Sequence, residues 1–203
     1  MTVYFIRCML FGAFVLGLPS FATLAQAQIE VPPVPAAIQV PAGFSAFLEG
    51  HAIGTQNFIC LATKKEMAWR FTGPQATLFL TLRNGQMQQV TTHFLSANPG
   101  ENGLGRPTWQ HSEDTSSVWG RVKASSTDPA YVAPGAIPWL LLEVAGAQLG
   151  PTGGDFMTGS VFIHRLNTTG GLAPATGCSE AADIGAVRFV PYTADYFFYR
   201  ADQ

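Results

Sequence analysis

Apolar and polar residues alternate along much of the chain, which is the pattern of β-strands with one buried face. The alternation is clearest over residues 77–83, where Leu78, Leu80 and Leu82 share one face and polar residues share the other. The Asn84-Gly85 dipeptide comes next, and it favours a tight hairpin turn. The pattern therefore predicts a strand that turns back at Gly85.

The returning strand of this hairpin is predicted over residues 86–95. With a period of two, Val90 and Phe94 should point to one face, and Thr91 and His93 should point to the opposite face.

Seven further runs resemble strands, and Gly, Pro, Asn and Asp separate most of them. They are residues 44–48, 58–62, 67–71, 117–124, 139–145, 160–167 and 186–192. Residues 139–142 are apolar on both faces, so this strand should be covered on both sides. Helical periodicity, strand–helix alternation and repeats are all lacking after residue 27. The pattern predicts an all-β single domain, either a sandwich or a jelly-roll-like barrel.

The first 27 residues have the order of a secretory signal peptide. Arg7 precedes an apolar run of about 11 residues, and Ala25-Gln26-Ala27 offers small residues at a cleavage point. A membrane span would need roughly 20 apolar residues. We expect a signal peptide over 1–27, a mature chain that begins at Gln28 and is secreted or periplasmic, and no membrane insertion after processing. Residues 28–43 contain four prolines and are predicted to form an extended arm beside a β domain over 44–203.

Composition removes several functional classes. Only 12% of the residues are charged while 47% are hydrophobic, which is not the composition of a disordered chain. The formal net charge of −2 is far from the basic surface that nucleic acid requires, so no nucleic-acid partner is expected.

Of three cysteines, Cys8 leaves with the signal peptide, so Cys60 and Cys178 are predicted to form a disulfide. The alternative is a catalytic thiolate, which an oxidising compartment disfavours.

Cofactor and metal motifs are absent from the sequence. No nucleophile elbow or phosphate loop is present, and the glycines at 100–105 and 150–154 lack the spacing of a dinucleotide site. No cofactor and no metal are therefore predicted. The four histidines never occur at zinc-ligand spacing. The closest cluster is His111 with Glu113 and Asp114, joined by His93 if the intervening loop closes, and its alternative is a solvated loop face.

A ligand site is predicted around Trp119. In a strand over residues 117–124, Trp119 shares the outward face with Arg121 and Lys123, and an exposed indole beside cations suits a sugar or ring. His111 and an enlarged loop over 96–106 would join it. Arg165 or Tyr196 would contribute if the fold brings them alongside. The competing interpretation is that Trp119 packs beneath the arm.

The mature chain resembles, nearly end to end, the exported bacterial and fungal family known as domain of unknown function 3455. The resemblance rests on the segments VPPVPAAIQVPAG, NFIC, WRFTGPQATL, PTWQHSEDTSSVWG, IPWLLLEV, FIHRLNTTGG and VPYTADYFFYR, and on Cys178. It implies a secreted single domain but no reaction, cofactor or ligand. Some fungal relatives carry a malate dehydrogenase label, which this sequence contradicts because it has no nucleotide-binding fingerprint.

Three classes of function remain open at this point. The first is a non-catalytic binding or envelope-associated module for a glycan or small molecule. The second is a hydrolase or lyase that uses Glu113, Asp114 or Asp195 in a cleft. The third is a structural or stress-induced surface protein. An enzyme would need converging carboxylates or a His–carboxylate pair in one concavity, whereas a glycan-binding module would need a flat aromatic platform.

Overall fold

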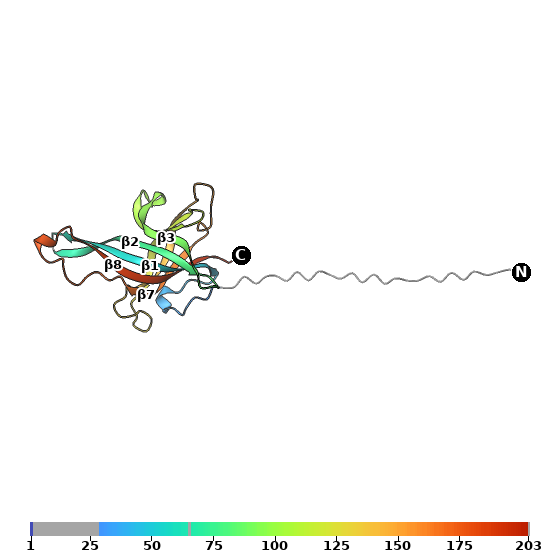
Figure 1. The fold of residues 1–203 in the computed structure, drawn as a ribbon, viewed down its shortest axis with the longest axis horizontal. Helices are drawn as coiled ribbons and strands as arrows, with labels where there is room; N and C mark the ends of the chain where they lie inside the picture. Colours follow the sequence, from blue (N-terminus) through green and yellow to red (C-terminus); the bar gives the residue numbers. More distant parts are fainter. Residues whose placement is uncertain (2–28, 65, 203) are drawn as a thin grey trace.

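The computed structural model describes residues 1, 29–64 and 66–202, and they form one all-β domain built on a closed antiparallel barrel (Figure 1). Each strand pairs with its neighbours in the chain, and β1 also pairs with β8. The strands are β1 (Phe44–Ala62), β2 (Met67–Thr81), β3 (Met87–Asn98), β4 (Leu104–His111), β5 (Ser117–Ser126), β6 (Trp139–Gln148), β7 (Phe162–Gly170) and β8 (Val187–Ala201). This confirms the predicted all-β fold and its barrel form.

Helical structure in the described residues is confined to three short 3₁₀ turns, η1 (Ala36–Ile38), η2 (Pro99–Glu101) and η3 (Ala181–Asp183). Within this part of the chain, no helix is long and apolar enough to cross a bilayer. The predicted signal peptide, apart from Met1, and its cleavage point lie outside the described residues.

The first strand is longer than the sequence pattern predicts. Residues 44–48 and 58–62 were expected as separate strands, but β1 runs continuously through Gly50 and Gly54. A Cβ atom on Gly54 would lie 2.2 Å from the carbonyl oxygen of Gln75 on β2. Glycine at this position therefore allows two strands to approach closely and does not end a strand.

The hairpin at Asn84-Gly85 is confirmed. β2 and β3 pair antiparallel. The Gly85 N–H donates to the Leu82 carbonyl, and the Leu82 N–H donates to the Gln86 carbonyl. Gly85 has a φ of 81°, so the turn uses glycine's access to the left-handed region.

The prediction of an enlarged loop over 96–106 is wrong for most of these residues. β3 continues to Asn98 and β4 begins at Leu104, so only residues 99–103 lie outside the two strands. Asn98 caps η2 by accepting from the Gly100 N–H, and Glu101 accepts two hydrogen bonds from Arg106. These contacts make the segment a short, rigid hairpin tip.

Two hydrophobic cores lie on opposite sides of the barrel wall. The interior core includes Leu142, Ile163 and Phe198, and the exterior core includes Trp139 and Leu141. Neighbouring residues of β6 therefore enter different cores. This confirms the prediction that this strand is covered on both faces.

The exterior core is covered by the Pro-rich segment over residues 29–43. Ile38 is fully buried within it, and apolar residues of the segment pack against β6, β7 and β8. The His164 Nε2–H donates to the Ile38 carbonyl at 2.6 Å, and the Tyr199 hydroxyl lies 2.9 Å from His164 Nδ1. Burial lowers the pKa of His164, so the neutral ring holds the segment on the barrel.

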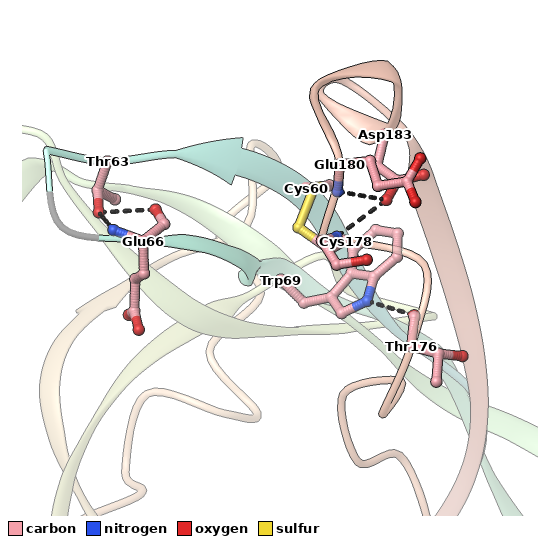
Figure 2. The surroundings of a disulfide bond; sticks show 9 residues. Cys60, Thr63, Glu66, Trp69, Thr176, Cys178, Glu180 and Asp183 are labelled. Atoms are coloured by element: carbon pink, nitrogen blue, oxygen red, sulfur yellow. Dashed lines mark hydrogen bonds between the residues drawn. A yellow bond between two sulfur atoms is a disulfide. The ribbon is translucent and has the colours of Figure 1, made fainter.

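The predicted disulfide between Cys60 and Cys178 is present, with 5.5 Å between the two Cα atoms (Figure 2). It ties the segment 171–186, which connects β7 to β8, to the end of β1. The Trp69 Nε1–H also donates to the Thr176 carbonyl at 3.0 Å, and the Arg188 guanidinium lies over the Trp69 ring. The connecting segment is thus fixed at two points, at Cys178 and at Thr176.

Candidate functional site: a cavity inside the barrel

A cavity of about 370 Å³ lies within one end of the barrel. All eight strands contribute to its wall, together with the segments before β6 and after β7. Its lining is Gln56, Phe58, Phe71, Pro74, His93, Pro107, Trp109, Val122, Ile137, Pro138, Leu140, Leu142, Arg165, Gly171, Leu172, Ala173 and Tyr196. Most of these side chains are apolar, as in sites for small molecules, and the volume is in the range of such sites.

The mouth and the inner wall of the cavity differ in exposure. Phe71, Val122 and Leu172 are 51%, 52% and 47% exposed, whereas Trp109 and Tyr196 are each 1% exposed. The cavity therefore opens between apolar side chains at the end of the barrel that carries the disulfide. Residues 171–173, on the segment that the disulfide fixes, form part of this opening.

His93 lies in the cavity wall because of a β-bulge. The register of β2 and β3 shifts at Val90, since Leu78 pairs with Thr91 while Phe79 pairs with Gln89. One extra residue in a strand reverses the faces of the residues after it. Val90 and His93 therefore both face the interior, and their expected placement on opposite faces is wrong.

The environment of His93 keeps its ring neutral. The ring stacks on Trp109 with 4.2 Å between centroids, and its Nδ1–H donates to the Thr108 carbonyl at 2.9 Å. Burial, opposed by this hydrogen bond and aided by the charge of Arg165, lowers the His93 pKa to about 3. With Nδ1 protonated, Nε2 is a hydrogen-bond acceptor.

Three other polar residues of the wall have buried donor groups without a hydrogen-bond partner among the described residues. They are the Gln56 amide nitrogen, the Trp109 indole nitrogen and the Tyr196 hydroxyl. Burial raises the pKa of Tyr196, and the neighbouring Arg165 and Tyr192 oppose that rise. An unpaired buried donor costs about 1–3 kcal/mol, so a ligand that accepts hydrogen bonds from these groups would offset that cost.

Arg165 is the cation of the cavity wall. It faces Tyr196 directly across the β7–β8 pair, and its Nε and Nη2 atoms donate to the Pro138 carbonyl at 3.2 and 2.9 Å. Among the described residues, no carboxylate lies within ion-pair distance of its guanidinium. Arg165 and Tyr196 were expected to join the Trp119 site if the fold brought them alongside it. They lie next to each other in the cavity wall, and Trp119 is not part of that wall.

Trp119 and Arg121 lie elsewhere, on the outer side of the barrel wall. The prediction of an exposed indole is wrong, because Trp119 is 5% exposed and its Nε1–H donates to Ser96 Oγ at 2.9 Å. Strand alternation does direct the ring outward, but the β3–β4 hairpin covers it. Arg121 pairs with Glu143 and Glu101.

His111 lies at the opposite end of the barrel from the cavity mouth. Its ring stacks on Phe156, and its Nδ1 lies 3.0 Å from an Asp114 carboxylate oxygen. Asp114 also accepts from Ser116 N–H and Oγ–H and from the Phe156 N–H. Burial opposes ionisation of Asp114, but these hydrogen bonds and His111 together lower its pKa to about 2. The carboxylate thus ties together two loops.

The three acids considered for catalysis do not converge. Glu113 accepts a hydrogen bond from Gln88 at the surface, and Asp195 lies 2.6 Å from His51 Nδ1 and accepts from Asn167. Neither these acids nor Asp114 line the cavity. In addition, the described residues contain no cluster of metal-ligating side chains.

Comparison with known proteins places the chain in a family. A profile described as "Protein of unknown function (DUF3455)" matches residues 41–200. The chain belongs to this family. No curated protein and no solved structure matches it. The matched region begins just before β1 and ends within β8, so the DUF3455 region contains the barrel and every residue of the cavity.

Several cavity residues of this DUF3455 barrel were not predicted as site residues. Gln56 lies in a stretch of β1 that was not predicted as a strand, and Trp109 was not among the predicted site residues. Cavity residues come from all parts of the chain, so only the strand register brings them together. The available signal in the sequence was an arginine, Arg165, within the mostly apolar run over residues 161–166.

Proposed function

We propose that this protein is a non-catalytic binding protein that holds a small, mainly apolar molecule in the barrel cavity. The observation that carries the proposal is an apolar cavity with a few polar groups on its inner wall and an open mouth. A closed antiparallel barrel with a cavity at one end suits this use, because the surrounding strands hold the wall rigid.

Between the two ligand classes considered from the sequence, the cavity favours a small molecule over a glycan. A glycan platform needs exposed aromatic faces, and Trp119 is covered. The aromatic rings of Trp109 and Tyr196 are enclosed in the wall, where they can contact a molecule that enters the barrel.

We further propose that the protein acts outside the cytoplasm after removal of residues 1–27. The disulfide supports this location, because such bonds persist in oxidising compartments. N-terminal sequencing of the protein recovered from the periplasm or medium should begin at Gln28. Recovery with Met1 in place would contradict the proposed processing.

The binding proposal is tested with N-phenyl-1-naphthylamine, a neutral apolar dye that fluoresces when removed from water. The native-sequence protein from residue 28 onward, with its disulfide intact, should enhance the dye's emission in a saturable manner. Ala173→Trp should weaken this binding by about tenfold or more, because the larger side chain fills the mouth.

The matched control is Ala175→Trp. Ala175 is exposed on the same segment but does not line the cavity. It should leave dye binding unchanged. An absence of saturable binding, or equal effects of the two variants, would overturn the proposed function.

A further inference from the structure

Arg165 differs from the other arginines of the described residues in its partners. Arg70, Arg106 and Arg121 each form an ion pair with a glutamate. Arg188 and Arg200 lie over the aromatic rings of Trp69 and Phe47, and Arg83 is exposed at the β2–β3 turn. Arg165 alone among them is a partly buried cation in an apolar wall with neither kind of partner. Burying a charge without a counter-charge is unfavourable, so a ligand that supplies a negative charge here would stabilise the protein.

The hydrogen bonds of Arg165 leave one edge of the guanidinium free. Nε and Nη2 both donate to the Pro138 carbonyl, which occupies the side edge. The remaining N–H groups are two on Nη1 and one on Nη2. Two of them form the end edge, whose geometry matches the two oxygens of a carboxylate.

The polar groups near Arg165 are mainly donors. Gln56, Trp109 and Tyr196 each have an unpaired N–H or O–H group in the same wall. No lining residue is a carboxylate, and the His93 ring is neutral. The cavity therefore combines one positive charge and several donors with a mostly apolar surface, which favours a ligand with an anionic, acceptor-rich head and an apolar body.

We propose that the cavity takes an organic monocarboxylate with an apolar body, and that the carboxylate binds at the free edge of Arg165. This inference rests on the proposed binding function and adds the chemical class of the ligand. Entry of the apolar body between Phe71, Val122 and Leu172 would also cover exposed hydrophobic surface at the mouth.

The experiment compares two ligands that differ only in the head group. Dodecanoate and 1-dodecanol compete with N-phenyl-1-naphthylamine at neutral pH and below their aggregation concentrations. The acid should displace the dye at a concentration about tenfold or more below that of the alcohol, because only the acid forms a charge-assisted pair with Arg165.

Variants of Arg165 then test whether this residue causes the preference for the acid over the alcohol. Arg165→Met keeps the length of the side chain and removes the charge, and it should abolish the advantage of the acid while dye binding persists. Arg165→Lys should retain part of that advantage. Arg83→Met is the matched control, because Arg83 is exposed and outside the cavity, and it should bind all three compounds as the unmodified protein does.

The outcomes separate this inference from the proposed function. Saturable dye binding with equal displacement by acid and alcohol would overturn the carboxylate assignment and leave the binding function in place. An acid preference that survives Arg165→Met would also overturn it. If Arg165→Met does not fold, the comparison of acid with alcohol on the unmodified protein still tests whether the cavity prefers a carboxylate. If the dye, the acid and the alcohol all fail to bind, both proposals fall.

Discussion

The two ends of the barrel differ in how their charged side chains are partnered. At the end that carries His111, the Asp114 carboxylate accepts from a backbone N–H on each of two loops and from a hydroxyl, and His111 lies beside it. At the cavity end, the charge of Arg165 has no counter-ion and the Tyr196 hydroxyl has no partner. The carboxylate at one end has its partners within the protein, and the guanidinium at the other end has no counter-ion.

This difference indicates how polar residues inside a fold divide between structure and binding. A carboxylate whose acceptor sites are filled by loop N–H groups has its interactions within the protein, and it fixes the loops. Donors that are buried in a cavity wall without partners lower the stability of the fold. Such unpaired donors suit a binding site, because a ligand that enters the cavity can accept their hydrogen bonds.

The largest effect is expected from removing the disulfide at the cavity end. The double variant Cys60→Ala/Cys178→Ala releases a crosslink that spans 118 residues. The chain-entropy relation gives a loss of about 4–5 kcal/mol in the free energy of unfolding, which denaturant titration measures. Dye affinity should fall as well, because residues 171–173 lose an anchor. A loss below about 1 kcal/mol would show that Thr176 and Trp69 hold the segment without the disulfide.

At the end that carries His111, Asp114→Ala should lower the free energy of unfolding by about 3 kcal/mol. The substitution leaves N–H groups of Ser116 and Phe156 without their acceptor. Dye binding should not change, since Asp114 is remote from the cavity. Glu113→Ala, at an exposed neighbour with one side-chain hydrogen bond, is the control and should change the stability by less than about 0.5 kcal/mol. Equal losses from the two variants would contradict the role of Asp114.

Acidification should destabilise the cavity wall through His93. Its pKa falls from an ordinary 6.5 to about 3 on folding, so the unfolded chain binds a proton in this window that the folded chain does not. Stability is therefore fully present above pH 6.5 and declines as the pH falls towards 3, by about 2 kcal/mol between pH 7 and pH 5. Urea titrations at these two values measure it.

The variant His93→Gln tests whether His93 causes this loss of stability on acidification. It should remove most of the decline and leave the smaller part due to His164, whose pKa is lowered in the same direction. An unchanged decline in this variant would exclude His93 as its source.

The smallest effect on stability is expected from Tyr196→Phe. This substitution removes a buried hydroxyl that has no hydrogen-bond partner, so the free energy of unfolding should change by less than about 0.5 kcal/mol or rise slightly. Thermal and denaturant unfolding measure it. A loss above about 1 kcal/mol would mean that the hydroxyl is satisfied in the folded protein.

The sequence predicted features that depend on local patterns. The Asn84-Gly85 hairpin, the coverage of residues 139–142 on both faces and the bond between Cys60 and Cys178 follow from turn chemistry, apolar periodicity and a count of cysteines. Each of these signals involves few residues. None depends on the register of distant strands.

The features it did not predict depend on non-local pairing. Residues 49–57 were not predicted as part of a strand, because the role of Gly54, a close approach to Gln75 on β2, involves a residue on another strand. The bulge at Val90 directs His93 inward, and a strict period of two places it on the other face. Trp119 points outward as the alternation indicates, but the hairpin that covers it comes from β3 and β4.

The pairing of the first strand with the last has a consequence for how the chain folds. Ser45 and Asp202, which are hydrogen-bonded at this seam, are 157 positions apart in the sequence. Closing so long a loop is entropically costly, and folding rates fall as contacts become less local. Until β8 is available, one long edge of β1 has unpaired backbone groups, which makes the incomplete barrel prone to association with other chains. Folding of this barrel should therefore be slow and should finish only after the last strand has been synthesised.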